Sequence, residues 1–245
     1  MKLINLLFTS AIVHHGCTAF QTLPPIGMRP FHSLDAPSEA VGVMFASRKS
    51  NNRKQSASTT KGFGVPPPTA EDVAVKFPSR VPDNAEGEDC PCLSHKQYGN
   101  CCALHHHGQK RTEEPIDVLR SRYSAFCYRI PLYIMATTHP TCRDYNENRL
   151  EWVKCLNRDG MFDSYDFVKL EIGDQESGDN ADEAYLDFKV TLRAKAETSQ
   201  CAPGQELTVL EKSRFLRDGD PLQWRYAGGD VRTDVIGIES VVLNA

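Results

Sequence analysis

Apolar residues in the second half of the chain recur first with the period of a helix and later with that of a strand. Behind Pro115, a residue favoured in the first turn of a helix, apolar side chains follow at intervals of three or four: Ile116, Leu119, Tyr123 and Phe126. This spacing predicts a helix over residues 112–126 with one buried face. The same period predicts two further helices, over residues 130–136 and 149–157.

After residue 165 the apolar period changes to two, which places alternate side chains on one face of a strand. The alternation is clearest at Leu186, Phe188, Val190 and Leu192. Four strands are predicted, over residues 165–172, 184–196, 207–216 and 222–226. The acid-rich residues 173–183 predict a solvated hairpin loop. Residues 231–245 contain enough apolar residues for an edge strand, with a tail as the alternative. Helices followed by an antiparallel meander predict an α+β fold.

The N-terminal third of the chain has the composition of a targeting sequence. Lys2 followed by the apolar residues 3–13 predicts a signal peptide over residues 1–19, with an apolar run too short to span a bilayer permanently. Residues 20–89 are rich in Ser, Thr and Pro, with basic residues in excess up to residue 70, and are expected to be transit peptide or disordered. Phe20 follows small residues, which resembles the "ASAF" step of bipartite plastid presequences. The sequence therefore predicts that the protein is imported into a plastid, with secretion as the alternative.

Charge and cysteine content narrow the classes of partner. The 245-residue chain has a net charge of −4, which gives no electrostatic drive toward nucleic acid, and no membrane span is expected in the mature chain. Of nine cysteines, four lie within thirteen residues and the remainder are scattered without pairing. A reducing compartment is favoured over a disulfide scaffold.

The four clustered cysteines predict a zinc site: Cys90, Cys92, Cys101 and Cys102. Two close thiol pairs separated by a short loop supply the four soft ligands that Zn²⁺ prefers in a tetrahedron. A redox or disulfide cluster is the alternative, since spacing alone does not decide. His95 and the triplet at residues 105–107 are substitute ligands to consider, although a surface histidine run is the simpler interpretation.

The cysteine segment resembles the SEC-C motif, whose usual form is Cys-x-Cys-Gly-Ser-Gly-x-x-Tyr-x-x-Cys-Cys or Cys-His. Ser94 and Tyr98 match this form, whereas Leu93 and His95 replace its two glycines. Glycine permits a tight turn with positive φ between the ligand pairs, so the turn in this chain is expected to be strained or reshaped.

Four further blocks resemble the YchJ-like family, in which a SEC-C motif precedes a nuclear transport factor 2-like domain. They are the "SRYSAF" helix at residues 121–126, the "THP" step at residues 138–140, the "E-x-SRF" strand at residues 211–215 and the "W-x-Y-x-G" segment at residues 224–228. The resemblance implies a zinc knuckle over residues 90–108 and a cone-shaped domain over residues 112–230. Because the family is functionally uncharacterised, it leaves the activity open.

Candidate residues near the mouth of the implied cone are Arg120, Tyr123, His139, Arg214 and Trp224. His139 is a candidate acid or base, although a local helix-capping role is favoured because no carboxylate is evident to orient its ring. Arg214, set among apolar strand residues, is expected to be buried and paired, with Asp117 the first candidate partner. Arg120 and Arg122 lie on different helix faces, so at most one is expected to line a pocket.

Two classes of function follow from these residues. In the first, the knuckle is a zinc-binding module on a scaffold domain that docks on a protein or ribosomal partner. In the second, the cone holds a small-molecule enzyme site or ligand site, although fold alone does not establish one. The first is favoured because a saturated metal site is the most strongly specified chemistry in the chain.

Overall fold

The computed structural model describes residues 66–159, 161–198 and 201–235. Its helices are α1 (Ala70–Val75), α2 (Cys102–His106), α3 (Pro115–Cys127), α4 (Pro131–Ala136) and α5 (Arg149–Asp159), with short 3₁₀ turns η1 (Ala85–Gly87) and η2 (Tyr98–Asn100). Its strands are β1 (Tyr165–Ser177), β2 (Glu183–Ala194), β3 (Glu206–Asp218) and β4 (Gln223–Val235). The predicted α+β order of three helices and an antiparallel meander is confirmed.

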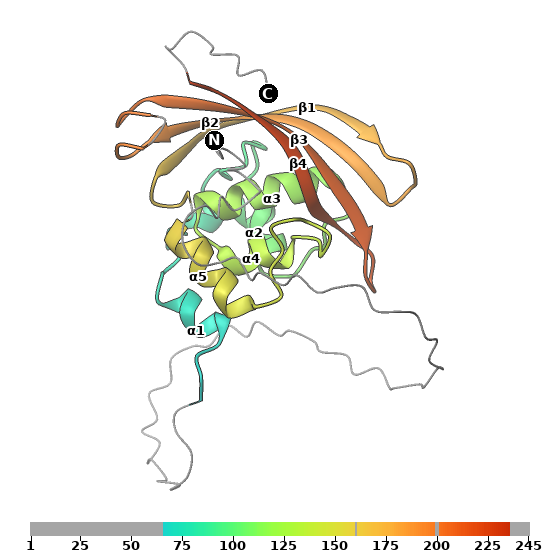
Figure 1. Ribbon diagram of the computed structural model, residues 1–245, viewed down its shortest axis with the longest axis horizontal. Coiled ribbons are helices and arrows are strands. Elements are labelled where there is room, and N and C mark those ends of the chain that lie inside the picture. Colours follow the sequence, from blue (N-terminus) through green and yellow to red (C-terminus); the bar gives the residue numbers. More distant parts are fainter. Residues whose placement is uncertain (1–65, 160, 199–200, 236–245) are drawn as a thin grey trace, which may run out of the picture. The chain divides into compact units, whose positions relative to one another are not determined.

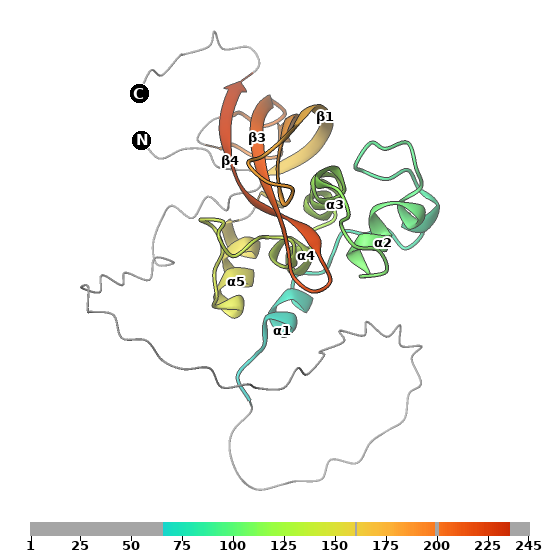
Figure 2. The ribbon, with the colours of Figure 1, turned by 90° about the vertical axis from the view of Figure 1, so that its right-hand side faces the viewer.

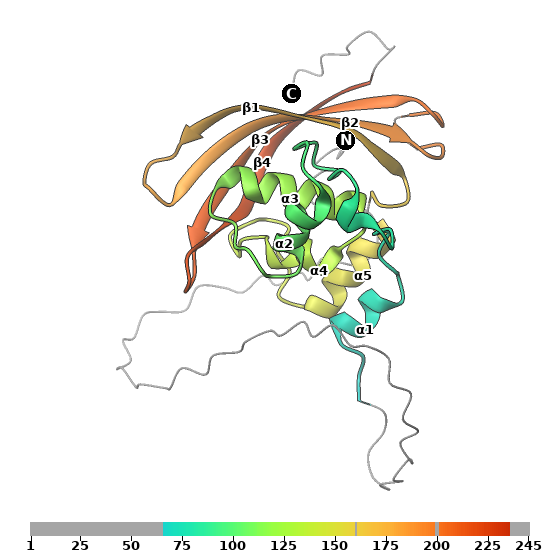
Figure 3. The same ribbon diagram turned by 180° about the vertical axis from the view of Figure 1, so that it is seen from behind.

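The four strands form one antiparallel sheet in the order β1-β2-β3-β4. The sheet arches over α3, and α4 and α5 lie beyond that helix (Figures 1 and 3). Leu186 and Val190 of β2, with Leu207 and Phe215 of β3, are fully buried on the face toward α3. Burial of this apolar face is the main force holding the helical layer to the sheet.

Helix α3 begins at Pro115, three residues after the predicted start, and this position has a physical cause. Asp117 accepts hydrogen bonds at 3.2 Å from the backbone N–H groups of Glu113 and Glu114, which precede Pro115. The apolar face identified from the sequence packs inward, with Leu119 and Tyr123 almost completely buried.

Two segments differ from the sequence-based expectation. The acid-rich residues 173–183 do not form one loop, because β1 continues to Ser177 with a register shift after Ile172. This outer strand exposes its last residues, so acidic side chains are tolerated there. Residues 66–89 were expected to lie outside the fold, yet α1 buries Ala70 and Val73, and the Arg80 side chain contacts Asp163.

Several sequence-based predictions concern residues outside the described part of the chain. The predicted signal peptide and most of the transit-peptide-like region fall within residues 1–65. At the other end β4 reaches Val235, so residues 231–235 belong to an edge strand of the sheet, and residues 236–245 are not described. Over the described residues, no helix has the length and apolar character needed to cross a membrane.

Candidate metal centre

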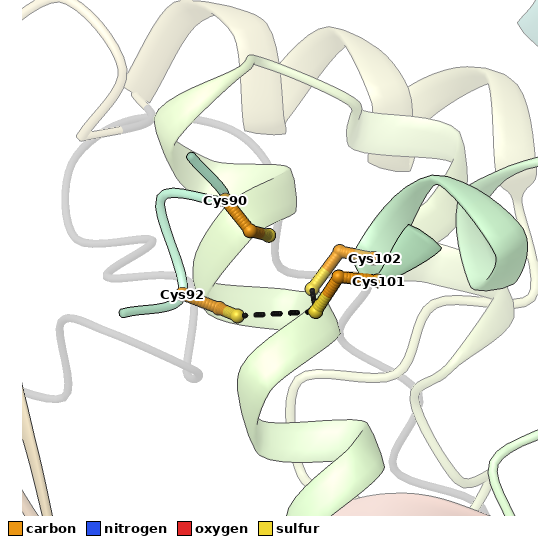
Figure 4. Close-up of side chains that lie close together, drawn as sticks. All are labelled: Cys90, Cys92, Cys101 and Cys102. Atoms are coloured by element: carbon orange, nitrogen blue, oxygen red, sulfur yellow. Dashed lines mark hydrogen bonds between the residues drawn. The ribbon is translucent and has the colours of Figure 1, made fainter. Parts of the chain in front are cut away.

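The cysteine pairs are brought together by a compact loop before α2. Asp89 and Gln97 form an isolated antiparallel bridge, and the Cys90 N–H donates to the Lys96 carbonyl at 2.8 Å. This folds the chain back so that the second pair, at the end of η2 and the start of α2, faces the first. In Figure 4 the four side chains point toward one another from these two segments.

All four sulfur atoms lie within 4.8 Å of one another. The Cys92 and Cys101 sulfurs are 3.6 Å apart, and those of Cys101 and Cys102 are 3.9 Å apart. A tetrahedral ion bonded to sulfur at about 2.3 Å requires sulfurs about 3.8 Å apart. The donor type and the spacing therefore both fit a zinc ion, and a disulfide, with sulfurs about 2.05 Å apart, is not formed by any of these four cysteines.

The local environment favours thiolates at two of the four positions. A hydrogen bond from Cys102 is the main cause that lowers the pKa of the Cys101 thiol to about 6. The pKa of Cys92 is also lowered, mainly by hydrogen bonding with Cys101. The Ser94 hydroxyl lies 3.1 Å from the Cys101 sulfur, where it can donate to a thiolate. Metal ligation requires deprotonated sulfur, so these contacts match the chemistry of the donor set.

The turn between the two cysteine pairs has the positive-φ backbone conformation that glycine normally adopts. Leu93 has φ 57° and His95 has φ 59°, both in the left-handed region. These are the two positions at which the SEC-C form has glycine, so the expected strain is present. Non-glycine residues pay about 1–2 kcal/mol each for this conformation. The side chains of Leu93 and His95 both remain exposed.

The nearby histidines have other partners. The Nδ1 atom of His106 lies 2.8 Å from the Tyr98 hydroxyl, and its Nε2 lies 2.8 Å from the Ser121 carbonyl oxygen. A carbonyl only accepts, so Nε2 carries the proton and Nδ1 accepts from Tyr98. Burial lowers the pKa of His106 to about 4, which keeps the ring neutral. His105 pairs with the Lys110 carbonyl at 3.1 Å. Within the described residues the metal-competent group consists of the four cysteines.

Contacts of the knuckle fasten it to α3, and the His106 ring packs edge-on against that of Tyr133 in α4. Besides the His106–Ser121 contact, the Cys102 thiol lies 3.5 Å from the Arg120 carbonyl, and Arg120 donates to the Cys92 carbonyl at 3.4 Å. Tyr98 also packs edge-on against Tyr128, with ring centroids 4.9 Å apart. Figure 2 shows α2 alongside α3. The cysteine loop is therefore packed into the fold through its own small apolar cluster.

The structure does not bring the five pocket candidates together. Arg120 faces the knuckle, whereas Tyr123 is buried in the core against Phe167. Trp224 packs under Arg217, whose guanidinium carbon lies 5.4 Å from the ring centroid, and its backbone pairs with Thr112. These side chains therefore do not form a common pocket.

His139 has the carboxylate neighbour that the sequence did not reveal. Its Nε2 lies 3.2 Å from an oxygen of Asp218, the last residue of β3. Its Nδ1 accepts from the Thr141 N–H at 3.1 Å, so Nε2 carries the proton toward Asp218. With both nitrogens engaged, the ring joins the loop after α4 to the β3–β4 turn.

Arg214 is not the buried arginine of this fold, and Asp117 is not its partner. Its side chain is 41% exposed and pairs with Glu183 of the neighbouring strand at 2.5 Å. The residues on either side, Ser213 and Phe215, are fully buried, so strand alternation directs Arg214 outward. The buried arginine is Arg122, which donates to the Ile134 carbonyl at 2.7 Å and to the hydroxyls of Thr137 and Thr138.

A buried polar cluster around Glu211 was missed by the sequence analysis. Glu211 is 3% exposed and accepts from the hydroxyls of Ser213 at 2.6 Å and Tyr226 at 2.9 Å. The Arg122 guanidinium lies 4.8 Å from the Tyr226 ring centroid. Burial raises the pKa of Glu211 to about 7. The sequence did hold a signal: Glu211, Ser213 and Phe215 are alternate residues of one strand, so their side chains lie on the same face.

The absence of a side chain at Gly229 leaves room for the Glu211 carboxyl group. A Cβ at Gly229, on the adjoining strand β4, would stand 2.4 Å from a carboxyl oxygen of Glu211. The register of β3 and β4 shifts nearby, between Arg214 and Phe215, where Gly228 has φ 124°. All four blocks that resemble the YchJ-like family thus contribute residues to this cluster or its immediate support.

Comparison with known proteins identifies relatives over the same region. A family model described as the middle, nuclear transport factor 2-like domain of YchJ matches residues 114–229. A UPF0225 protein of Vibrio vulnificus is 30% identical over 142 residues, covering 57% of this chain and 73% of that protein. A UPF0225 protein of Vibrio parahaemolyticus is 28% identical with the same coverage.

Solved structures of SEC-C motif proteins also align with the chain. One, from Rhodopseudomonas palustris, is 22% identical with a TM-score of 0.43, covering 58% of this chain and 98% of that one. Another, from Psychrobacter arcticus, is 21% identical with a TM-score of 0.41, covering 60% and 81%.

The comparisons contradict the predicted localisation. The relatives that match the chain are bacterial UPF0225 proteins, and bacteria have no plastid. The prediction of a plastid, with secretion as its alternative, is therefore wrong. Its presequence residues lie outside the described part of the chain.

Proposed function

The chain belongs to the YchJ-like family of UPF0225 proteins, and from that premise we propose that it is a structural zinc-binding protein whose knuckle serves as an interaction module. The observation that carries the proposal is the approach of four thiol sulfurs to within 4.8 Å of one another, with two of the pairs 3.6 and 3.9 Å apart. Four cysteine ligands leave no open coordination position, which is typical of structural rather than catalytic zinc.

The ion would be held by Cys90, Cys92, Cys101 and Cys102, and when bound it cross-links the loop before η2 to the start of α2. This loop is too small to be held by its apolar cluster alone, so ligation supplies folding free energy. Its exposed turn, with Leu93 and His95 at the surface, is the part available to a protein or ribosomal partner.

Metal counting on the purified full-length chain tests the proposal. We expect about one zinc per chain, released by a strong chelator and lost in the Cys101→Ser variant, with Cys201→Ser as the matched control. Cys201 is a buried cysteine remote from the cluster in the chain, so its replacement should leave the zinc content unchanged. Metal-free protein with unreacted thiols after growth in zinc would refute the proposal.

A second candidate function, an acid–base or ligand site inside the cone, is favoured by one observation. Glu211 is buried, yet its second carboxyl oxygen has no hydrogen-bond partner among the described residues. An unpartnered buried oxygen of this kind is costly unless something donates to it. A native mass spectrum that shows a small molecule retained beside zinc, and lost in Glu211→Ala, would support this candidate.

A further inference from the structure

Three cationic side chains border a cleft beside the cysteine cluster. The cleft, of about 320 Å³, is lined by Lys96, Lys110 and Arg120 together with Cys101 and Cys102. In the described part of the chain, none of these three cations forms an ion pair. The acid that also borders the cleft, Asp117, is engaged with the backbone at the start of α3. A negative group beside these gathered like charges would be favourable.

The ligated cysteine cluster would be that group. One Zn²⁺ with four thiolates carries a net charge of −2, and three of the four cysteines are buried. A charge held away from water is strongly disfavoured unless opposite charge lies close to it. Arg120 and Lys96 together supply two positive charges at the rim, so the cations and the cluster offset each other.

Arg120 has a second connection that the lysines lack. Its guanidinium donates to the carbonyl of Cys92, in the first ligand pair, at 3.4 Å. Its own carbonyl lies 3.5 Å from the sulfur of Cys102, in the second pair. The side chain of Arg120 therefore holds the first pair, while its backbone lies against the second. Its neighbour Arg122 points instead into the buried polar cluster with Tyr226.

We propose that Arg120 is a positioning residue of the metal centre, which holds the first ligand pair against α3 through the Cys92 carbonyl and, with Lys96, neutralises the charge of the ligated thiolates. The inference depends on the proposed zinc function and adds to it that a helix of the cone completes the knuckle. Partners of metal ligands outside the coordination shell typically change metal affinity by about 10–100-fold when removed.

The rate of zinc release to excess 4-(2-pyridylazo)resorcinol tests this in the zinc-loaded full chain. Arg120→Gln should release zinc about tenfold faster than the wild type, and Arg120→Lys, which keeps the charge, should fall between them. The matched control is Arg193→Gln, which removes the same charge from an exposed ion pair with Glu206 on the sheet and should leave the rate unchanged.

The outcomes separate the two proposals. A wild-type chain without zinc contradicts the zinc function itself. A wild-type chain with one zinc, and an Arg120→Gln variant that releases it as slowly as Arg193→Gln, overturns only the role of Arg120. If Arg120→Gln does not fold, Lys96→Gln decides, because that side chain is exposed and its loss does not disturb packing. We expect release at least about threefold faster in Lys96→Gln, and an unchanged rate would overturn the proposal.

Discussion

Replacing Glu211 with Gln should make the folded protein more stable at alkaline pH. Burial raises the pKa of this carboxyl from 4.5 to about 7, and the hydrogen bonds from Ser213 and Tyr226 offset only part of that effect. The charges that act on it are Arg122 of α3, which lowers its pKa, and Asp144, which raises it. Gln keeps an oxygen that accepts both hydrogen bonds and never carries the charge.

The sign and size follow from the difference in proton affinity. A carboxyl with a raised pKa binds its proton more tightly in the folded chain, so its contribution to stability is fully present below pH 4.5 and is lost as pH rises through about 7. Each pKa unit corresponds to about 1.4 kcal/mol, so ionisation removes up to about 3 kcal/mol. The variant lacks this loss, and the two proteins should diverge above neutral pH.

Urea denaturation followed by tryptophan fluorescence measures this difference, because Trp152 and Trp224 are both buried. The free energy of unfolding of wild type minus variant should fall by about 2–3 kcal/mol between pH 5 and pH 8.5. Glu206→Gln, an acid at the start of the same strand in an ion pair with Arg193, is the control and should show no such slope. Parallel pH profiles for wild type and Glu211→Gln would refute the burial argument.

Two other predictions concern the turn and the arginines. Leu93→Gly and His95→Gly should each raise the stability of the zinc-loaded protein by about 0.5–1 kcal/mol in thermal unfolding, because glycine relieves the strain of the positive φ but adds freedom to the unfolded chain. Leu93→Ala should bring no gain. Equal melting temperatures for Leu93→Gly and Leu93→Ala would contradict the presence of backbone strain at this position. Arg122→Met should lower the free energy of unfolding by about 3–5 kcal/mol, because it removes the buried guanidinium that donates to the Ile134 carbonyl and to two hydroxyls. Arg214→Met should cost less than about 1 kcal/mol, and equal losses in the two variants would contradict the difference in burial.

Local patterns were enough to predict helices α3 to α5, the four strands and the four cysteines of the candidate site. Helical spacing at Leu119 and Tyr123, and alternation along β2, report directly on burial of one face. The left-handed turn was foreseen from a missing glycine at Leu93 and His95. Each of these inferences involves residues close together in the chain.

The parts that sequence reasoning missed depend on contacts between distant residues. Whether Arg122 or Arg214 is buried depends on how α3 meets the sheet, and the alternation of Ser213 and Phe215 was the clue that Arg214 points outward. Helix α1 has only six residues, too few to show a helical period, and it is held by the packing of Ala70 and Val73 against the rest of the fold. The role of His106 requires Tyr98 and Ser121 to approach it from separate elements.

X-ray absorption at the zinc edge, on the purified full-length chain, tests the central claim most directly. The account predicts one zinc per chain with four sulfur neighbours at about 2.3 Å, and no bound zinc in Cys101→Ser. It is contradicted by a first shell that contains nitrogen or oxygen in the wild type, or by a purified wild-type chain that holds no zinc.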